Sequence, residues 1–460
     1  MGPTATEGRP RRAESIPLRH VLPNLVRDPA RALVEFGERS RGEVVRLNFG
    51  SFRPYLVTRP EHLQQVLREK SGNYVRAGDG LQWRPLQRLF GQGILSDGEP
   101  WSNSRQVLQP LFTARRIDGL VDRLAEAIED AVDELDGPAR AGRPVDMGAE
   151  QARIVCSAIM RVFFADKISV PDALRIMEAQ DAVAWSVMPR ILVPWAPLAV
   201  PMPGDRAFRR AVKLIDELLL PIVRASKETA ESDGDDIIAT LWRGRTPDGG
   251  RLDEHQVRND TVSMVATTTE TTISVLTWLW PHIERDPVVA ERLYEEIDRV
   301  VGGAPVRREH LRELRYTRQV LEELLRLYPI GWLFPRRAAE EDVIGGVRIP
   351  AGATIVVSPL ITHRMSTFWD RPEVFDPDRF APEQVRARHR WAHFPFGGGP
   401  HQCIGMHLFY LEATLIVATV LSRYRFRLQR PTVPGIKVAA ALRPLDPVEL
   451  TLRPAASVAA

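Results

Sequence analysis

Cys403 is the residue whose type and surroundings best suit chemistry in this sequence. It lies in a glycine-rich loop, FPFGGGPHQCIG over Phe394–Gly405, in which consecutive glycines allow a tight turn of the backbone. The apolar run from Ile404 onward, IGMHLFYLEATLIVATVL, predicts a strong helix that begins directly after the cysteine. The unpaired N–H groups and the dipole at a helix N-terminus favour the thiolate form of a nearby sulfur. A thiolate in such a loop is either a metal ligand or a nucleophile.

Other uses of this cysteine fit the sequence less well. The sequence has two cysteines, and an ordinary buried thiol is the usual fate of a lone cysteine. Cys156, in the apolar stretch IVCSAIM, fits that description, whereas the loop of Cys403 does not. A nucleophile needs a histidine base, and His401 is close in sequence, but such neighbours usually point in different directions. A zinc site needs further Cys, His or acidic ligands, and no cysteine-rich set supplies them.

The cysteine loop carries a family resemblance. Phe396–Gly405, FGGGPHQCIG, matches every fixed position of F-x-x-G-x-x-x-C-x-G and resembles the haem-binding loop of the cytochrome P-450 family. The resemblance implies that Cys403 is the axial thiolate of the iron of haem b, iron protoporphyrin IX, where it donates electron density that favours O–O cleavage. It also implies that Phe396 belongs to the cofactor-binding loop and that His401 meets a haem propionate.

Two more segments resemble landmarks of the family, in the expected order. ELLR at Glu323–Arg326 resembles the E-x-x-R helix, whose spacing places carboxylate and guanidinium on one face. PDRF at Pro377–Phe380 resembles the P-x-R-F element, which supplies a second arginine, Arg379, to the same glutamate. In isolation Glu323 and Arg326 would be taken for a solvated surface ion pair. The ordered matches favour a structural role for all three charged residues.

Further residues are assigned to haem propionates by the resemblance. Trp101 and Arg105, in WSNSR, resemble the W-x-x-x-R of a helix whose Trp and Arg contact a propionate. Arg336 follows Pro329 by seven residues and falls where the family often places another such arginine, with its neighbour Arg337 as the alternative.

The predicted central helix departs from the family pattern. The pattern is (A/G)-G-x-(D/E)-T-(T/S), and the corresponding segment is Thr267–Thr272, TTTETT. Glu270 and Thr271 match the acid–alcohol pair that in relatives delivers protons to iron-bound dioxygen. Threonine replaces both the small residue and the glycine, and its hydroxyl can bond to the carbonyl one turn back.

Hydroxyl groups recur at helical spacing in this segment. Counting back by four from Thr271 gives Thr267 and Ser263, so one face is predicted to carry three hydroxyls toward the haem. Thr267 is therefore a third candidate for proton delivery. The plainer interpretation, that a hydroxyl satisfies only a backbone carbonyl, is preferred for Thr268, Thr269 and Thr272.

The patterning predicts a mainly α fold with minor β. Helical spacing is found over Leu120–Leu135, over Val257–Trp280 with Pro281 ending it, and over Arg307–Leu327 with Pro329 stopping it. Strands are predicted at Val44–Leu47, Pro54–Val57, Val347–Val357 around a turn at Pro350–Gly352, and Val448–Leu452. The family's fold would place the long central helix over the haem and the cysteine loop below it.

Length and composition limit the organisation of the chain. A length of 460 residues predicts about three domains of typical size. The only candidate breaks, GPARAGRP and GRTPDGG, are of loop length, so we expect a flexible tail over 1–19 and a single haem-thiolate monooxygenase domain over 20–460.

A net charge of +3 without basic blocks disfavours a nucleic-acid partner. No apolar N-terminal signal is found and prolines interrupt Val183–Pro203, so we expect a cytoplasmic monomer without a membrane anchor.

Three segments are assigned to substrate contact by the resemblance: about Asp79–Leu95, Val183–Pro203 and Ile330–Pro335. They are rich in Trp, Leu, Val and Pro and almost free of acid, which suits a neutral, apolar and bulky substrate. Such residues are more often core than pocket. The resulting hypothesis is a terpenoid or polyketide intermediate of bacterial secondary metabolism, including antibiotic biosynthesis.

Electrons are expected from other proteins. The sequence has no G-x-G-x-x-G after a strand, so a separate ferredoxin and ferredoxin reductase are implied as donors. A basic stretch before the cysteine loop is a candidate ferredoxin-docking surface, and a solvated charged loop is nearly as good an interpretation. Its residues, with two that could extend it, are Arg386, Arg388, His389, Arg390, Arg115 and Arg116.

The leading hypothesis is a monooxygenase that inserts one oxygen atom of O2 into a C–H bond. Peroxide-driven oxidation, oxidative ring closure and desaturation on the same scaffold are the alternatives. Members of the family that bypass dioxygen often lack the acid–alcohol pair, so Glu270 and Thr271 favour the first. A haem sensor or carrier is disfavoured because no output domain is recognisable.

Overall fold

A computed structural model of the chain describes residues 10–17, 19, 27–49, 52–76, 87, 89–180, 200–232, 234–439 and 441–455. The chain divides into two compact units. Unit 1 comprises Met1–Ala77, Gly331–Glu373 and Arg388–Gln402, and unit 2 comprises Gly78–Ile330, Val374–Ala387 and Cys403–Ala460. The single domain expected over 20–460 stays a prediction.

Unit 1 is built on a six-stranded sheet with the strand order β1-β2-β3-β9-β6-β4. β1 pairs with β2 and β3 with β9 in parallel, and the other neighbours are antiparallel. The strands are β1 (Glu14–Pro17), β2 (Val45–Asn48), β3 (Tyr55–Val57), β4 (Tyr74–Val75), β6 (Phe334–Ala338) and β9 (Thr354–Val357), with β7 (Asp342–Ile344) and β8 (Val347–Ile349) as a separate pair. The predicted strands near both ends of the chain are thus present, with the turn at Pro350–Gly352 between β8 and β9.

The N-terminal segment is more ordered than expected. Glu14–Pro17, which fall within the tail predicted over 1–19, form β1 and pair with Val45–Asn48. The side chain of Ile16 is buried in the same apolar cluster as Leu47 and Leu56. The sheet therefore begins inside that tail.

Short helices flank the sheet within unit 1. They are α2 (Pro29–Ser40), α3 (Pro60–Gln64), the π-helical turn η2 (Gln65–Glu69), α17 (Pro359–Thr362) and the 3₁₀ turns η6 (Arg390–Ala392) and η7 (Gly399–His401). One apolar cluster of the unit joins residues of β3 and β9 to Trp391 and Phe394, which precede the glycine loop. The start of the cysteine loop is thereby fixed to the core of unit 1.

Unit 2 is mainly helical. Its helices before the central one are α5 (Gly98–Leu108), α6 (Ala114–Asp118), α7 (Val121–Asp133), α8 (Asp136–Ala141), α9 (Met147–Phe164), α11 (Asp205–Thr229) and α12 (Ile237–Arg243), with η3 (Gln109–Phe112) after α5. The later ones are α13 (Glu254–Thr277), α14 (Leu279–Arg285), α15 (Pro287–Val301), α16 (Arg315–Leu327), α18 (Pro382–Ala387) and α19 (Met406–Arg423), with η4 (Arg308–Arg312) and η5 (Pro377–Phe380). Small sheets β10-β13-β5 and β11-β12 complete the unit, with β5 (Pro144–Asp146), β10 (Tyr424–Leu428), β11 (Ile436–Val438), β12 (Leu442–Pro444) and β13 (Glu449–Pro454).

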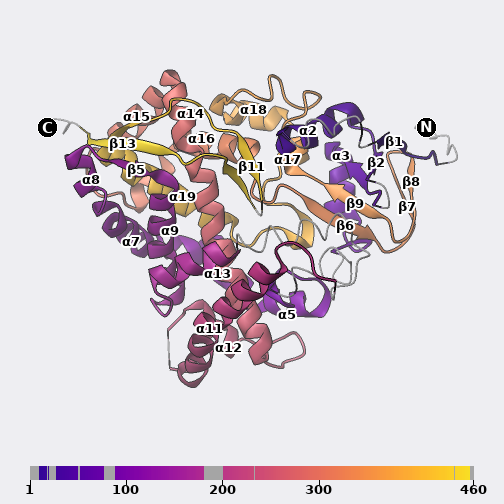
Figure 1. Cartoon of the computed structure of the whole chain (residues 1–460), viewed down its shortest axis with the longest axis horizontal. Coiled ribbons are helices and arrows are strands. Elements are labelled where there is room, and N and C mark those ends of the chain that lie inside the picture. Colours follow the sequence, from indigo (N-terminus) through magenta and orange to yellow (C-terminus); the bar gives the residue numbers. More distant parts are fainter. Residues whose placement is uncertain are drawn as a thin grey trace. The chain divides into compact units, whose positions relative to one another are not determined.

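α13 is the central helix of unit 2 and packs against α9, α11 and α19 (Figure 1). Asp253 caps it, since its carboxylate accepts the N–H of Gln256 at 2.7 Å. The prediction that Pro281 ends this helix is wrong. α13 ends at Thr277, where Trp278 stacks on Tyr328, and Pro281 lies in the first turn of α14, where a missing N–H is tolerated.

Two other helix starts differ from the prediction. The helix expected from residue 307 begins with η4, and α16 starts separately at Arg315, because the buried Glu296 accepts the N–H groups of Tyr316 and Thr317. α19 starts at Met406 and not directly at Ile404.

The stretch Gly399–Arg423 is apolar enough, by length and composition, to cross a membrane. However, 67% of its most apolar window is buried inside the protein, which is typical of a core helix.

Candidate active site

The thiol of Cys403 lies at the start of α19 and is exposed, whereas the helix that follows is mostly buried. In unit 2 it interacts electrostatically with the guanidinium of Arg105. Burial lowers the pKa of Arg105, and the negative charge of the Cys403 thiolate opposes that change. An accessible cysteine sulfur is the ligand that a haem thiolate site requires, and a helix start and a nearby cation favour its thiolate form. The residues present therefore fit a haem thiolate.

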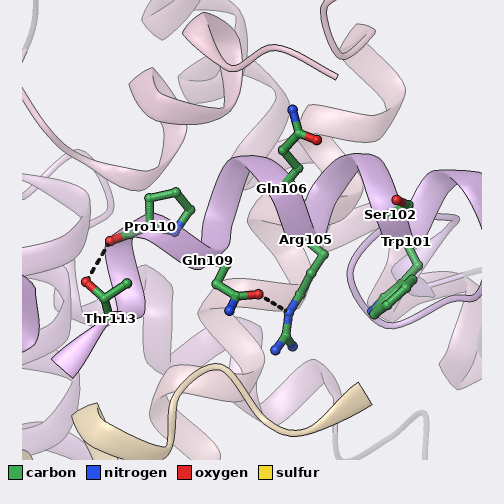
Figure 2. A pocket seen from close by; sticks show the side chains of 7 residues that line it. All are labelled: Trp101, Ser102, Arg105, Gln106, Gln109, Pro110 and Thr113. Atoms are coloured by element: carbon green, nitrogen blue, oxygen red, sulfur yellow. Dashed lines mark hydrogen bonds between the residues drawn. The ribbon is translucent and has the colours of Figure 1, made fainter. Parts of the chain in front are cut away.

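Trp101 and Arg105 lie on one face of α5, where a hollow of about 480 Å³ opens. Figure 2 shows Trp101, Arg105 and Gln109 projecting to the same side of this helix. Arg105 Nε donates to Gln109 Oε1 at 2.7 Å. The hollow is lined by residues of α5, η3 and the residue after it, namely Trp101, Ser102, Arg105, Gln106, Gln109, Pro110 and Thr113. The two residues predicted to contact a propionate thus share a single accessible face.

The glycine loop of unit 1 is close-packed. Gly399 has a φ of +68°, and a Cβ at this position would lie 1.8 Å from the carbonyl oxygen of Leu67. A Cβ at Gly398 would lie 2.3 Å from the ring of Trp391. The glycines therefore allow a close approach to η2 and η6, which an alanine could not make. Phe396 and His401 lie in this loop, and both are half-buried.

Arg336 and Arg337 lie on opposite faces of β6. The side chain of Arg336 is buried, and its Nη1 donates to the carbonyl of Pro335 at 2.8 Å. Arg337 is exposed. Because strand residues alternate between faces, only one of the two can point into the protein, and that residue is Arg336.

The buried charge cluster of unit 2 joins α16 to η5. Arg326 Nε and Nη2 donate to Glu323 Oε2 and Oε1 at 2.6 and 2.7 Å. Arg379 Nε lies 3.5 Å from Glu323 Oε1, and the N–H of Asp376 donates to the same oxygen. Glu323 and Arg326 are fully buried, so the solvated surface pair considered for them is excluded.

From residue 260 onward, partial exposure on α13 is confined to the three residues predicted to be catalytic. Between residues 260 and 283, all of which the structure describes, only Thr267, Glu270 and Thr271 are not fully buried. Thr271 Oγ1 donates to the carbonyl of Thr267 at 3.1 Å, and Thr267 Oγ1 donates to the carbonyl of Ser263 at 2.8 Å. The hydroxyls thus follow one face at helical spacing but bond to the backbone and not to each other.

The neighbouring threonines divide into two kinds. Thr268 and Thr269 donate to the carbonyls of Met264 and Val265, as the plainer interpretation predicted. For Thr272 that interpretation is wrong, because its hydroxyl donates to Glu412 Oε2 at 2.6 Å.

Glu412, on α19, is fully buried. Its Oε1 has no hydrogen-bond partner among the described residues. Burial raises the pKa of this carboxyl to about 8, and the hydrogen bond from Thr272 acts in the opposite direction. This carboxyl is therefore largely protonated near neutral pH. The sequence did not predict this residue, since an acid in an apolar helix gives no sign of its partner.

Glu270 is held by residues that the sequence did not indicate. Arg443 of β12 donates through Nε to Glu270 Oε1 at 2.9 Å and through Nη2 to Oε2. Ser274 Oγ donates to the same Oε1 at 2.8 Å. The arginine lies 173 positions away in the sequence, so no local pattern could predict the pair.

Basic residues proposed for partner docking have different environments. In unit 1 the guanidinium of Arg388 lies 4.3 Å from the ring centre of Trp369, and Arg390 is exposed. In unit 2 Arg386 and Arg115 are exposed, whereas Arg116 pairs with Asp235 at 2.7 Å. Most of the segments assigned to substrate contact, including 79–86 and 183–199, lie outside the described residues.

Comparison with known proteins identifies the family. The family described as Cytochrome P450 matches residues 10–451. Cyclooctatin synthase of Streptomyces melanosporofaciens is 29% identical, covering 90% of this chain and 88% of that protein. Cyclooctat-9-en-7-ol 5-monooxygenase of the same organism is 31% identical over 86% and 84% of the two chains. Pentalenene oxygenase of Streptomyces avermitilis is 28% identical over 84% of each.

A solved structure shares the fold. The haem domain of cytochrome P450DA has a TM-score of 0.80 and 21% identity, covering 97% of this chain and 98% of that chain. The mainly α fold with minor β is thus confirmed, and the family and its monooxygenase-named members show an oxidoreductase that incorporates oxygen and uses haem. The chain belongs to the cytochrome P450 family.

Proposed function

We propose that this enzyme hydroxylates an apolar, bulky terpenoid, with haem b bound through Cys403. The observation that carries the proposal is the exposed Cys403 thiol at the start of α19, facing Arg105. Overall, R–H, O2, two electrons and two protons give R–OH and water. When bound, the haem iron supplies the oxygen chemistry. In this proposal Arg105, Trp101, Arg336 and His401 hold its propionates, and Phe396 belongs to the loop that positions the thiolate.

The protons are assigned to residues of α13. Thr271 Oγ1 and Thr267 Oγ1 lie on the partly exposed face, and each can exchange its backbone acceptor for a ligand or a water. Glu270 relays protons to this face: its carboxylate accepts a proton from water and passes it on toward the hydroxyls. Because Arg443 and Ser274 hold both of its oxygens, Glu270 must change a partner to do so. The scaffold of Glu323, Arg326 and Arg379 serves the fold and not the chemistry.

A terpenoid substrate is supported by the relatives. Three bacterial members with 28–31% identity bear names of terpenoid-modifying enzymes, which favours a terpenoid over a polyketide. We further propose a role in bacterial secondary metabolism, including antibiotic biosynthesis, and a cytoplasmic, monomeric enzyme.

Electrons come from a separate ferredoxin and its reductase, with Arg386, Arg388, His389 and Arg390 as the docking surface. Arg116 is a weaker member of that surface because Asp235 neutralises it.

The haem assignment is tested with carbon monoxide. The reduced protein is expected to show the strongly red-shifted Soret band of thiolate ligation, and Cys403→Ser to lose it. Cys156→Ala is the matched control and should retain the band, since Cys156 is buried against Met177. A red-shifted band in the Cys403→Ser protein would disprove the assignment.

The substrate and the electron donor need separate measurements. Difference spectra against terpenoids and macrolides should show binding of terpenoids; binding of macrolides alone would overturn the substrate class.

NADPH alone should give no turnover, whereas NADPH with added ferredoxin and reductase should give turnover. Charge reversal of Arg386, Arg388 and Arg390 should slow reduction and flatten its salt dependence. The same reversal at the exposed Arg209 and Arg210 of α11 should not, and equal effects would exclude the docking surface.

A further inference from the structure

Gln109 is joined to Arg105 at two points. Its side-chain oxygen Oε1 accepts a hydrogen bond from Arg105 Nε at 2.7 Å, and its backbone N–H bonds to the carbonyl of the same arginine. Trp101, Arg105 and Gln109 follow one another at intervals of four residues, so they project to one side of the helix (Figure 2). Gln109 therefore contacts the arginine that the sequence assigns to a haem propionate, and the sequence did not indicate this contact.

The backbone holds Gln109 in place. Gln109 keeps the helical conformation at the end of α5 and begins η3. Phe112, the last residue of η3, is buried and stacks on Phe163 of α9, with the ring centres 5.7 Å apart. The acceptor is thus anchored to the core of unit 2. An arginine side chain without such an acceptor has many rotamers, and binding an anion would have to restrict them.

The acceptor is also neutral. Of the described residues that line the hollow on α5, only Arg105 is charged. A carboxylate at the position of Gln109 would neutralise the guanidinium and repel a second anion, whereas an amide orients the guanidinium and leaves its charge intact. Three other arginines that pair along a helix at a separation of four do so with a carboxylate, namely Arg39 with Glu35, Arg140 with Asp136 and Arg318 with Glu322.

The hydrogen bond to Gln109 also selects an edge of the guanidinium. Because Nε donates to Gln109, a carboxylate must approach the edge formed by Nη1 and Nη2, where two parallel hydrogen bonds can bind it. The same guanidinium interacts electrostatically with Cys403. The orientation of this one side chain therefore affects both the anion that it binds and the sulfur at the start of α19.

We propose that Gln109 is a positioning residue, which fixes the guanidinium of Arg105 in the orientation that binds a haem propionate. This inference rests on the proposed function, because it concerns the same haem. A fixed cation beside the haem retains the cofactor, and it favours the reduced iron, since reduction adds one negative charge. Releasing the guanidinium is therefore expected to weaken haem retention and to lower the reduction potential.

Gln109→Met tests the role of the acceptor. Methionine has a similar length and helix propensity, but its thioether is only a weak acceptor. Transfer of haem from the holoenzyme to excess apomyoglobin should be about tenfold faster in this variant, equivalent to about 1.4 kcal/mol. Its reduction potential, measured by spectroelectrochemistry, should be lower than that of the wild type. An unchanged potential would overturn the proposal, whatever the rate of haem loss.

A double variant distinguishes positioning from a structural role at the end of α5. In an Arg105→Ala background, Gln109→Met should change neither haem transfer nor the potential further, because the side chain through which it acts is gone. An effect of equal size in both backgrounds would contradict the proposal.

Gln109→Glu keeps the test informative if Arg105→Ala does not retain haem. Glutamate can still accept from Arg105 Nε, but it neutralises the guanidinium. Its reduction potential should fall at least as far as that of Gln109→Met. A potential equal to that of the wild type would contradict the role assigned to the neutral amide.

The outcome for the proposed function is separate. If the wild-type protein lacks the thiolate band with carbon monoxide, the haem assignment fails, whatever Gln109 does. If the band is normal and Gln109→Met retains the wild-type potential, only the role of Gln109 fails.

Discussion

The two halves of α13 use polar side chains in opposite ways. Near its start, Gln256, Arg258 and Asp260 reach across to other segments of unit 2. In the middle, the hydroxyls of Thr267 and Thr271 return to carbonyls of the same helix. In the first region Arg258 and Asp260 are buried and Gln256 is partly exposed, and the second region contains the only partly exposed residues between 260 and 283.

We infer from this difference that the first region holds neighbouring segments in place and that the second serves the reaction. A buried group that hydrogen-bonds to another segment cannot separate from it without leaving buried polar atoms unpaired. The group therefore fixes that segment in place. A hydroxyl bonded to its own helix can exchange its acceptor for a ligand at little cost, because the helix keeps its ladder of backbone bonds. We therefore expect substitutions in the first region to change stability, and those in the second to change the reaction.

The largest loss of stability is expected for Asp260→Ala. The change leaves the buried N–H of Ile94 without its acceptor, whereas the hydroxyl of Ser104 keeps the carbonyl of Pro100 at 3.0 Å. The free energy of unfolding of the holoenzyme in urea should fall by about 1–3 kcal/mol. Asp260→Asn should lose less than half of that. A loss below about 1 kcal/mol for the alanine variant would show that the start of α13 holds little.

Glu412 gives the next effect, and it depends on pH. Its pKa is about 8 in the folded protein against 4.5 for an ordinary glutamate, so the folded state binds more protons between those values. The free energy of unfolding therefore falls as pH rises through this window, by a few kcal/mol at most. Thr272 and Cys156 are the neighbouring polar groups that face it.

Glu412→Gln replaces the titrating carboxyl by an amide that does not titrate. Relative to this variant, the wild-type protein should lose stability between pH 5 and pH 8, measured by urea unfolding at a series of pH values about one unit apart. Parallel pH profiles for the two proteins would mean that the carboxyl does not titrate in this range.

Arg443→Gln is expected to affect stability less, since its ion pair with Glu270 is partly exposed, with 27% and 16% of the two side chains accessible. We expect a loss of about 1 kcal/mol. Its main effect should be on the reaction, because Glu270 loses a bidentate partner and becomes free to turn. Product formed per NADPH should change, whereas Arg427→Gln, at an exposed position on β10, should leave it unchanged.

The sequence predicted the elements with local signals. The cysteine loop, the amphipathic α7 and the long α13 follow from glycine spacing and helical periodicity, and the buried Glu323–Arg326 pair lies within one turn. Arg443, the ion-pair partner of Glu270, lies 173 positions away, and Ile94, which donates to Asp260, lies 166 positions away, so no periodicity indicates them. Pro281 led to a wrong prediction of where the helix ends, because proline is compatible with the first turn of a following helix.

Thr271→Ala should leave stability almost unchanged. Alanine favours a helix by up to about 0.7 kcal/mol over threonine, and the lost hydrogen bond is to the same helix. Haem binding should persist, but electrons should be diverted to peroxide or water, which lowers the product formed per NADPH. Thr271→Ser retains the hydroxyl and should restore coupling. Full coupling in the alanine variant would favour the peroxide-driven or ring-closing alternatives.

Thr267→Ala has the smallest expected effect and separates two roles for its hydroxyl. The change should not alter stability by more than about 0.7 kcal/mol, for the reason given for Thr271. Thr267 lies one helical turn before Thr271 on the partly exposed face, so a role in proton delivery predicts reduced coupling with unchanged substrate affinity. A role as a wall of the pocket predicts full coupling with altered affinity. We expect the first, because Ser263, the next hydroxyl on this face, is buried without a hydrogen-bond partner among the described residues and can extend the path. Thr269→Ala, at a fully buried position on the same helix, is the matched control. If coupling were reduced in that protein as well, the effect would belong to the helix and not to the hydroxyl of Thr267.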